Sequence, residues 1–155
     1  MAYRITGLDP APFRHLYGLS DETLRDLGVT RYTATTKPGF PDRVEVRDLE
    51  PGEQALLLNY EHQPAPTAYR ARHAIFVREG AEQAFDQVNV IPEPLTLRPI
   101  SLRAFSSAGE MLDADLAEGD EVEGAIERLL DNPAVAYLHA HYAKRGCYAA
   151  RVERA

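Results

Sequence analysis

Polar side chains that can do chemistry are concentrated in residues 59–73. This stretch holds one carboxylate, two imidazoles that titrate near neutral pH, one phenol and two guanidinium groups, which bind carboxylates or phosphates through paired donors. We expect a loop between two apolar strands, because loops held by a rigid core often carry binding residues. The six residues are Glu61, His62, Tyr69, Arg70, Arg72 and His73.

The composition of this loop indicates a site for a small anionic molecule, either binding or catalytic. Tyr69, Arg70 and Arg72 are the candidate contacts to the ligand, while the glutamate and the two histidines are the catalytic candidates. The alternative is a polar surface loop whose arginines pair with nearby acids, since a loop that connects buried strands carries polar residues in any case. The sequence identifies no reaction and no cofactor.

A second group of candidates lies near the C-terminus. His139 and His141 are two positions apart, so on a strand their side chains share one face, and two metal ligands can be presented in this way. A third ligand would have to come from residues 59–73 on a neighbouring strand. Because the spacing is common by chance, we predict no metal site and keep the two histidines as candidates. His139 and Arg151 are also candidate contacts to the anion.

The single cysteine, Cys147, cannot form an intrachain disulfide. As a nucleophile it would need a nearby base such as His141 and a positive setting, which Arg145 and Arg151 would supply. The alternative is a small, partly buried residue beside a turn. No local signature of a cysteine hydrolase supports the nucleophile.

The net charge of −7 comes from one segment of the chain. Between Ala104 and Glu127 there are eight acidic residues and no Lys or Arg, which leaves 16 acids against 17 bases elsewhere. Nucleic-acid-binding proteins usually carry a basic patch or stripe, so we exclude nucleic acid as a partner. The nearly neutral remainder is compatible with a local anion site.

The N-terminus lacks the basic and apolar regions of a signal peptide, and no run approaches the roughly 20 apolar residues of a membrane span. We therefore expect a cytoplasmic protein that makes no contact with a membrane. A length of 155 residues is most simply one domain that spans residues 1–155.

Periodicity and capping residues predict an α+β fold, mainly antiparallel sheet with two short N-terminal helices. The helix signals are Asp9-Pro10 and, for the second helix, Ser20 at its start and Gly28 at its end. Residues 120–130 have capping-box spacing from Asp120 and one apolar face, which predicts an amphipathic helix. Strands are expected at 3–8, 29–36, 43–47, 54–60, 73–77, 95–107 and 111–116, with 29–36 and 43–47 in one hairpin and the last two paired.

Residues 134–155 fit two structures. Asn132-Pro133 and Gly146 would cap a helix across 135–145, whereas a turn at 144–146 would give a β-hairpin. Pairing Ala143 with Cys147 sorts the hairpin into an apolar face and a polar face that carries both histidines. This sorting favours the hairpin.

Four segments carry a family resemblance: Asn59–Pro64, Tyr69–Arg70, His73–Gly80 and Gly146–Arg154. In them the chain resembles a bacterial family catalogued as domain of unknown function 1203, over nearly its whole length. The resemblance implies a small single-domain bacterial protein whose C-terminal segment is a strand pair, in agreement with the hairpin. It implies no activity, so it adds no site residue.

Two functions of different classes fit these observations. The first is a small-molecule site built from the 59–73 loop and the polar face of the C-terminal hairpin. The alternative is a non-catalytic interaction module or self-associating domain, in which case a homo-oligomer is expected. The histidines discriminate between them, because clustering in a pocket favours the first function and dispersal favours the second.

Overall fold

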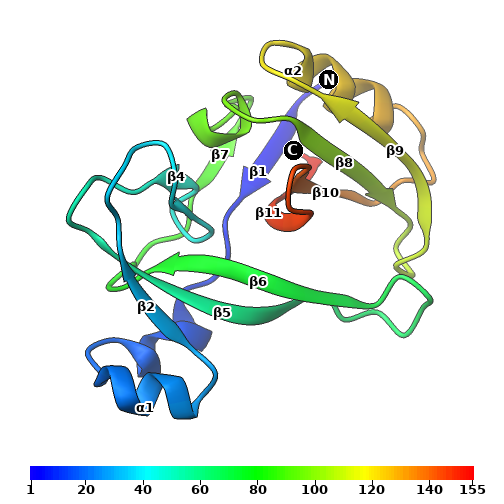
Figure 1. The fold of residues 1–155 in the computed structure, drawn as a ribbon. Coiled ribbons are helices and arrows are strands. Elements are labelled where there is room, and N and C mark those ends of the chain that lie inside the picture. The colour runs from blue at the N-terminus through cyan, green and yellow to red at the C-terminus, as the bar shows by residue number, and fades with distance from the viewer.

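The computed structural model describes residues 1–155 and contains two β-sheets. The larger sheet has six strands in the order β7-β1-β11-β10-β8-β9, and the smaller has five in the order β2-β5-β6-β3-β4. All strand pairs are antiparallel except β3 with β6. Figure 1 shows the larger sheet beside helix α2, and β2, β5 and β6 of the smaller sheet below it. The α+β prediction is confirmed.

The larger sheet joins the two ends of the chain, because β1 pairs with β11 and places Ile5 opposite Val152. Its β8 and β9 form the predicted pair, and helix α2 follows them. None of the helices is long and apolar enough to cross a membrane. The elements of this part are β1 (Tyr3–Thr6), β7 (Asp86–Val88), β8 (Ile100–Phe105), β9 (Met111–Ala117), α2 (Glu121–Leu130), β10 (Tyr137–Tyr142) and β11 (Cys147–Arg154).

The smaller sheet is centred on β5 and β6, the two apolar strands predicted on either side of residues 59–73. The connecting loop is shorter than predicted, because residues 59–63 belong to β5, residues 71–73 belong to β6, and only residues 64–70 lie between the strands. The helical segments are short, and two of them, η1 and η2, are 3-10 helices. The elements are η1 (Ala11–Leu16), α1 (Asp21–Asp26), β2 (Thr30–Thr33), β3 (Pro41–Asp42), β4 (Arg47–Asp48), β5 (Gln54–Gln63), β6 (Ala71–Arg78) and η2 (Glu93–Leu95).

The two faces of the β10–β11 hairpin contribute to different cores. Leu138 and Val152 belong to a cluster of 21 buried residues that includes Ile126 of α2. Tyr148 belongs instead to a cluster of 12 that includes Leu56 of β5. Since side chains alternate along a strand, α2 and the smaller sheet cover opposite faces of the hairpin. Both faces are therefore withdrawn from water.

The start of helix α1 follows the capping prediction. The Ser20 hydroxyl accepts a hydrogen bond from the Thr23 backbone N–H at 3.1 Å, and Gly28 takes a φ of 77° just beyond the helix end. At α2 the capping prediction is wrong, because Asp120 has helical dihedrals and its side chain caps nothing. The apolar face of α2 is as expected, with Val122, Ile126 and Leu130 buried.

The predicted hairpin of 29–36 with 43–47 is wrong. Strand β2 pairs with β5, and residues 43–46 form a turn between the two-residue strands β3 and β4. The buried Asp42 carboxylate fixes this turn by accepting hydrogen bonds from the backbone N–H groups of Glu45 and Arg78. The alternation of polar and apolar residues here therefore reflects a turn held by tertiary hydrogen bonds.

The C-terminal hairpin is confirmed, and its register matches the prediction only in part. Leu138 pairs with Val152 and His139 with Arg151 as expected, but a bulge after Ala140 places His141 opposite Tyr148. The predicted polar face is not at the surface, because His139 and His141 are only 4% and 1% exposed. The smaller sheet covers this face, which sequence alternation cannot reveal.

Candidate functional site

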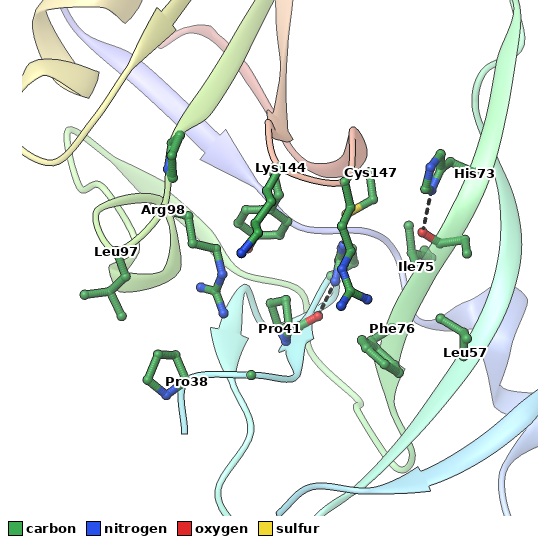
Figure 2. Close-up of a pocket in the computed structure, with 16 residues that line it drawn as sticks. Pro38, Pro41, Leu57, His73, Ile75, Phe76, Leu97, Arg98, Lys144 and Cys147 are labelled. Atoms are coloured by element: carbon green, nitrogen blue, oxygen red, sulfur yellow. Dashed lines mark hydrogen bonds between the residues drawn. The ribbon is translucent and has the colours of Figure 1, made fainter. Parts of the chain in front are cut away.

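A cavity of about 610 Å³ opens between the two sheets, beside the turn of the β10–β11 hairpin. Figure 2 shows Arg98 and Lys144 on one side of it and Leu57, Ile75 and Phe76 on the other. We call it the inter-sheet pocket. Its lining residues are Pro38, Gly39, Pro41, Arg43, Leu57, His73, Ala74, Ile75, Phe76, Leu97, Arg98, Pro99, Tyr142, Lys144, Arg145 and Cys147.

The charged side chains in this lining are all cations. They are three arginines and one lysine, and no aspartate or glutamate lines the pocket. His73, half-buried on β6, adds an imidazole whose Nδ1 lies 3.0 Å from the Ala74 carbonyl oxygen. A pocket of one charge sign raises the local concentration of the opposite ion, so this one attracts anions.

Arg43 is the most buried of the four cations, with an exposed fraction of 2%. It lies in the β3–β4 turn, and its guanidinium donates to the carbonyl oxygens of Pro41 and Tyr148 and to Cys147 Sγ, 3.0 Å away. No carboxylate forms an ion pair with it, and its charge also lies 4.9 Å from the centre of the Tyr142 ring. Buried charges are usually paired, so Arg43 lacks the counter-ion that its burial calls for.

Arg98 differs from Arg43 because a carboxylate already neutralises it. Its two terminal nitrogens bind the two oxygens of the buried Asp48 at 3.0 and 2.5 Å, a bidentate ion pair. Its guanidinium also lies 5.1 Å from the centre of the Tyr142 ring. The pair fixes the edge of the pocket and adds little net charge.

Lys144 and Arg145 occupy the turn of the β10–β11 hairpin. Gly146 closes this turn with a φ of 80° and a hydrogen bond from its N–H to the Tyr142 carbonyl oxygen at 2.8 Å. Both cations are exposed, and neither has a hydrogen-bond or ion-pair partner in the structure. They are therefore free to bind an anion at the mouth of the pocket.

Three of the five histidines form a separate buried cluster between the sheets. The ring centre of His62 lies 4.9 Å from that of His141 and 6.3 Å from that of His139, and Tyr148 packs against all three rings. One ring nitrogen of each histidine is buried without a hydrogen-bond partner, while His141 Nδ1 lies 2.9 Å from the Gly146 carbonyl oxygen.

Burial keeps the histidine cluster neutral. It lowers the pKa of His62 from the ordinary value and lowers the pKa values of His139 and His141 to about 3. Nearby positive charges also lower these pKa values, and Arg103 does so for all three histidines. No group of three His, Cys, Asp or Glu side chains is arranged to hold a metal ion.

The predicted site residues are distributed over three places. Of the 59–73 candidates, only His73 lines the inter-sheet pocket, and His62 joins the buried cluster with His139 and His141. The exposed Arg70 pairs with Glu61 at 3.2 Å.

The remaining candidates also contact neighbours outside the pocket. Arg72 donates to the Asn59 side chain, and Tyr69 packs edge-on against Phe105. Arg151 lies 4.0 Å from the centre of the Tyr137 ring. The candidate residues of 59–73 and those of the hairpin therefore do not line one shared concavity.

Sequence reasoning missed most of the pocket. Arg43 was expected on the solvated face of a strand, Arg98 in the first part of the strand 95–107, and Tyr142 on an apolar face of the hairpin. Lys144 and Arg145 were recognised only as turn residues, or as a positive setting for the cysteine. The sequence does carry one signal for the last two residues. Lys144 and Arg145 are adjacent in a tight hairpin turn that contains no acidic residue, so neither cation can form an ion pair within the turn.

A family model described as "Protein of unknown function (DUF1203)" matches residues 39–154. This range contains every residue of the inter-sheet pocket except Pro38. No curated protein and no solved structure matches the chain.

Proposed function

Since the chain belongs to the DUF1203 family of proteins of unknown function, we propose a function from its pocket: the protein binds a small anionic molecule between its two sheets. The observation that carries this proposal is the charge of the lining, which holds four cations, of which only Arg98 is paired with a carboxylate. Pockets of 300–1,000 Å³ with a few convergent polar groups are typical of small-molecule sites, and this one has about 610 Å³.

The four cations have different roles in the proposed site. Arg43 is the central contact, because a guanidinium has five N–H donors and only three hydrogen bonds of Arg43 are made within the protein. Lys144 and Arg145 complete the positive field from the mouth. Arg98 is held by Asp48 and shapes the wall. A bound anion supplies the counter-charge that the protein does not provide for Arg43.

The proposal retains one part of the expected site and replaces another. His73 and the turn of the C-terminal hairpin contribute to the pocket. Arg70 and Arg72 are not included, because their side chains already bind Glu61 and Asn59 at the surface. Binding rather than catalysis is proposed, since no side chain in the pocket forms a nucleophile and base pair by hydrogen bonding.

The double variant Lys144→Gln/Arg145→Gln tests this function. Both side chains are exposed and unpaired, so the fold should tolerate their loss. Calorimetric titration with sodium benzoate at low ionic strength should show binding to the wild type and at least tenfold weaker binding to the variant, because each charged hydrogen bond contributes roughly 1.5–3 kcal/mol. The matched control is Arg25→Gln, which removes an exposed, unpaired cation of α1. Equal affinity of all three proteins would contradict the proposal.

A self-associating module is the second candidate, favoured by one observation. β9 is an edge strand of the larger sheet, and its Leu112 and Leu116 are 45% and 64% exposed. Exposed apolar side chains on an edge strand favour pairing with another chain, whereas the adjacent Asp113 and Asp115 oppose it. Light scattering after size-exclusion chromatography measures the oligomeric state. A wild-type dimer that Leu116→Glu dissociates would support this candidate, and a monomer at all concentrations would exclude it.

A further inference from the structure

The two sides of the inter-sheet pocket differ in chemistry, and this difference indicates which anion fits. We infer that the ligand is an organic carboxylate with an apolar body, such as an aromatic acid, rather than an inorganic oxyanion. This inference rests on the proposed function and names its ligand class.

The smaller sheet supplies an apolar side to the pocket. Leu57 of β5 and Phe76 of β6 pair directly in the sheet and both line the pocket, and Figure 2 shows these two side chains across the space from Lys144 and Arg98. Phe76 is fixed in place, because its ring packs 5.4 Å from that of Phe40 and 5.6 Å from that of Tyr32. The apolar side is therefore a firm surface and not a mobile loop.

Further apolar residues continue this surface around the pocket. The exposed Pro38 and the partly exposed Pro99 line it, and so does Leu97, which is 51% exposed although it is large and apolar. Exposed apolar side chains that gather around one concavity are typical of ligand sites. An apolar ligand body would cover them.

An inorganic oxyanion would use only half of this pocket. Phosphate or sulfate would meet the cations but leave the apolar side in contact with water and most of the 610 Å³ unfilled. An aromatic acid places its carboxylate against Arg43 and Lys144 and its ring against Leu57 and Phe76. Burying about 100 Å² of apolar surface lowers the Kd roughly 70-fold. The cost of ordering the ligand in the pocket makes this factor smaller.

The carboxylate and the apolar body have separate tests. Four probes are titrated into the wild-type protein by calorimetry at one pH and ionic strength: sodium benzoate, sodium acetate, sodium phosphate and neutral benzamide. We expect benzoate to bind at least tenfold more tightly than acetate and phosphate, because only benzoate contacts both sides. We expect benzamide to bind at least tenfold more weakly than benzoate, because it lacks the charge.

Two variants assign these differences to the two sides of the pocket. Leu57→Ala/Leu97→Ser should weaken benzoate several-fold and leave acetate and phosphate unchanged. Lys144→Gln/Arg145→Gln should weaken all three anions and leave benzamide unchanged. A thermal melt of each variant confirms that it is folded, and Leu97→Ser alone, at an exposed loop position, serves if the double substitution does not fold.

The outcomes separate this inference from the proposed function. If phosphate or acetate binds as tightly as benzoate and responds to Lys144→Gln/Arg145→Gln, the inference is overturned while the anion site stands. If no anion binds, or if benzamide binds as tightly as benzoate, both are overturned. Benzoate binding that weakens in both double variants supports both.

Discussion

The buried histidine cluster makes the stability of the protein depend on pH in a defined window. His139 and His141 are neutral in the folded protein, with pKa values lowered to about 3, and they return to the ordinary value of 6.5 when the chain unfolds. Below pH 6.5 the unfolded chain therefore takes up protons that the folded protein does not. The stability that the neutral rings provide is fully present above pH 6.5 and is lost as the pH falls toward 3.

The size of this loss follows from the two pKa values. Between pH 7 and pH 5, each histidine costs about 2 kcal/mol of unfolding free energy, and the pair costs about 4 kcal/mol. A typical domain has only about 5–15 kcal/mol in total, so a large fraction is lost. The carboxylates act at lower pH, as Glu53 shows: Arg47 lowers its pKa to about 2, and the resulting stability is lost between 4.5 and 2.

Urea unfolding at pH 7 and pH 5 measures this effect, and His139→Phe assigns it. Phenylalanine keeps the ring packing against Phe105 and Tyr137 but binds no proton, and it removes a buried nitrogen that has no partner. The loss between the two pH values should shrink by about 2 kcal/mol in this variant. The control Tyr148→Phe alters the same cluster without removing a histidine and should keep the full loss. An equal pH dependence of wild type and His139→Phe would refute the reasoning.

Substitutions at three further positions test the contacts that hold the fold together, each by urea unfolding at pH 7. Ser20→Ala removes the cap of α1 and should cost about 1 kcal/mol, whereas Ser20→Asp, which restores a cap, should cost much less. Gly7→Ala places a methyl group 2.0 Å from the Val44 carbonyl oxygen in the turn that carries Arg43, and should cost roughly 2–4 kcal/mol. Asp48→Asn breaks the buried pair with Arg98 and should cost about 3–5 kcal/mol. A loss of unfolding free energy below 1 kcal/mol would contradict the close approach of the backbone at Gly7 or the importance of the buried ion pair at Asp48.

The sequence predicts elements whose signals are local. Ser20 and Gly28 mark helix α1, the apolar face of 122–130 marks α2, and the sorting of residues 135–153 into two faces marks the hairpin. The register of the hairpin is predicted only up to Ala140, because a bulge follows it, and beyond the bulge Tyr148 packs into the core of the smaller sheet. Local patterns carry no information about that contact.

The candidate site is less accessible to sequence reasoning, because it forms between segments that are far apart in the chain. Arg43 appears in an alternating pattern that favours an exposed strand position, and only hydrogen bonds to Pro41, Cys147 and Tyr148 explain its burial. The charged loop residue Arg70, in contrast, has a partner close by in Glu61. None of the cations of the pocket pairs with an acidic residue nearby in the sequence. Which groups they contact depends on the fold, so the sequence alone does not reveal it.

A crystal structure of the protein soaked with 4-bromobenzoate tests the central claim most directly, because the anomalous signal of bromine locates the ligand without ambiguity. We predict the carboxylate within hydrogen-bonding distance of Arg43 or Lys144 and the bromine on the side of Leu57 and Phe76. Ligand bound only at the exposed side chains of Arg70 and Arg72, or an inter-sheet pocket that stays free of ligand when the compound is bound elsewhere, would contradict it.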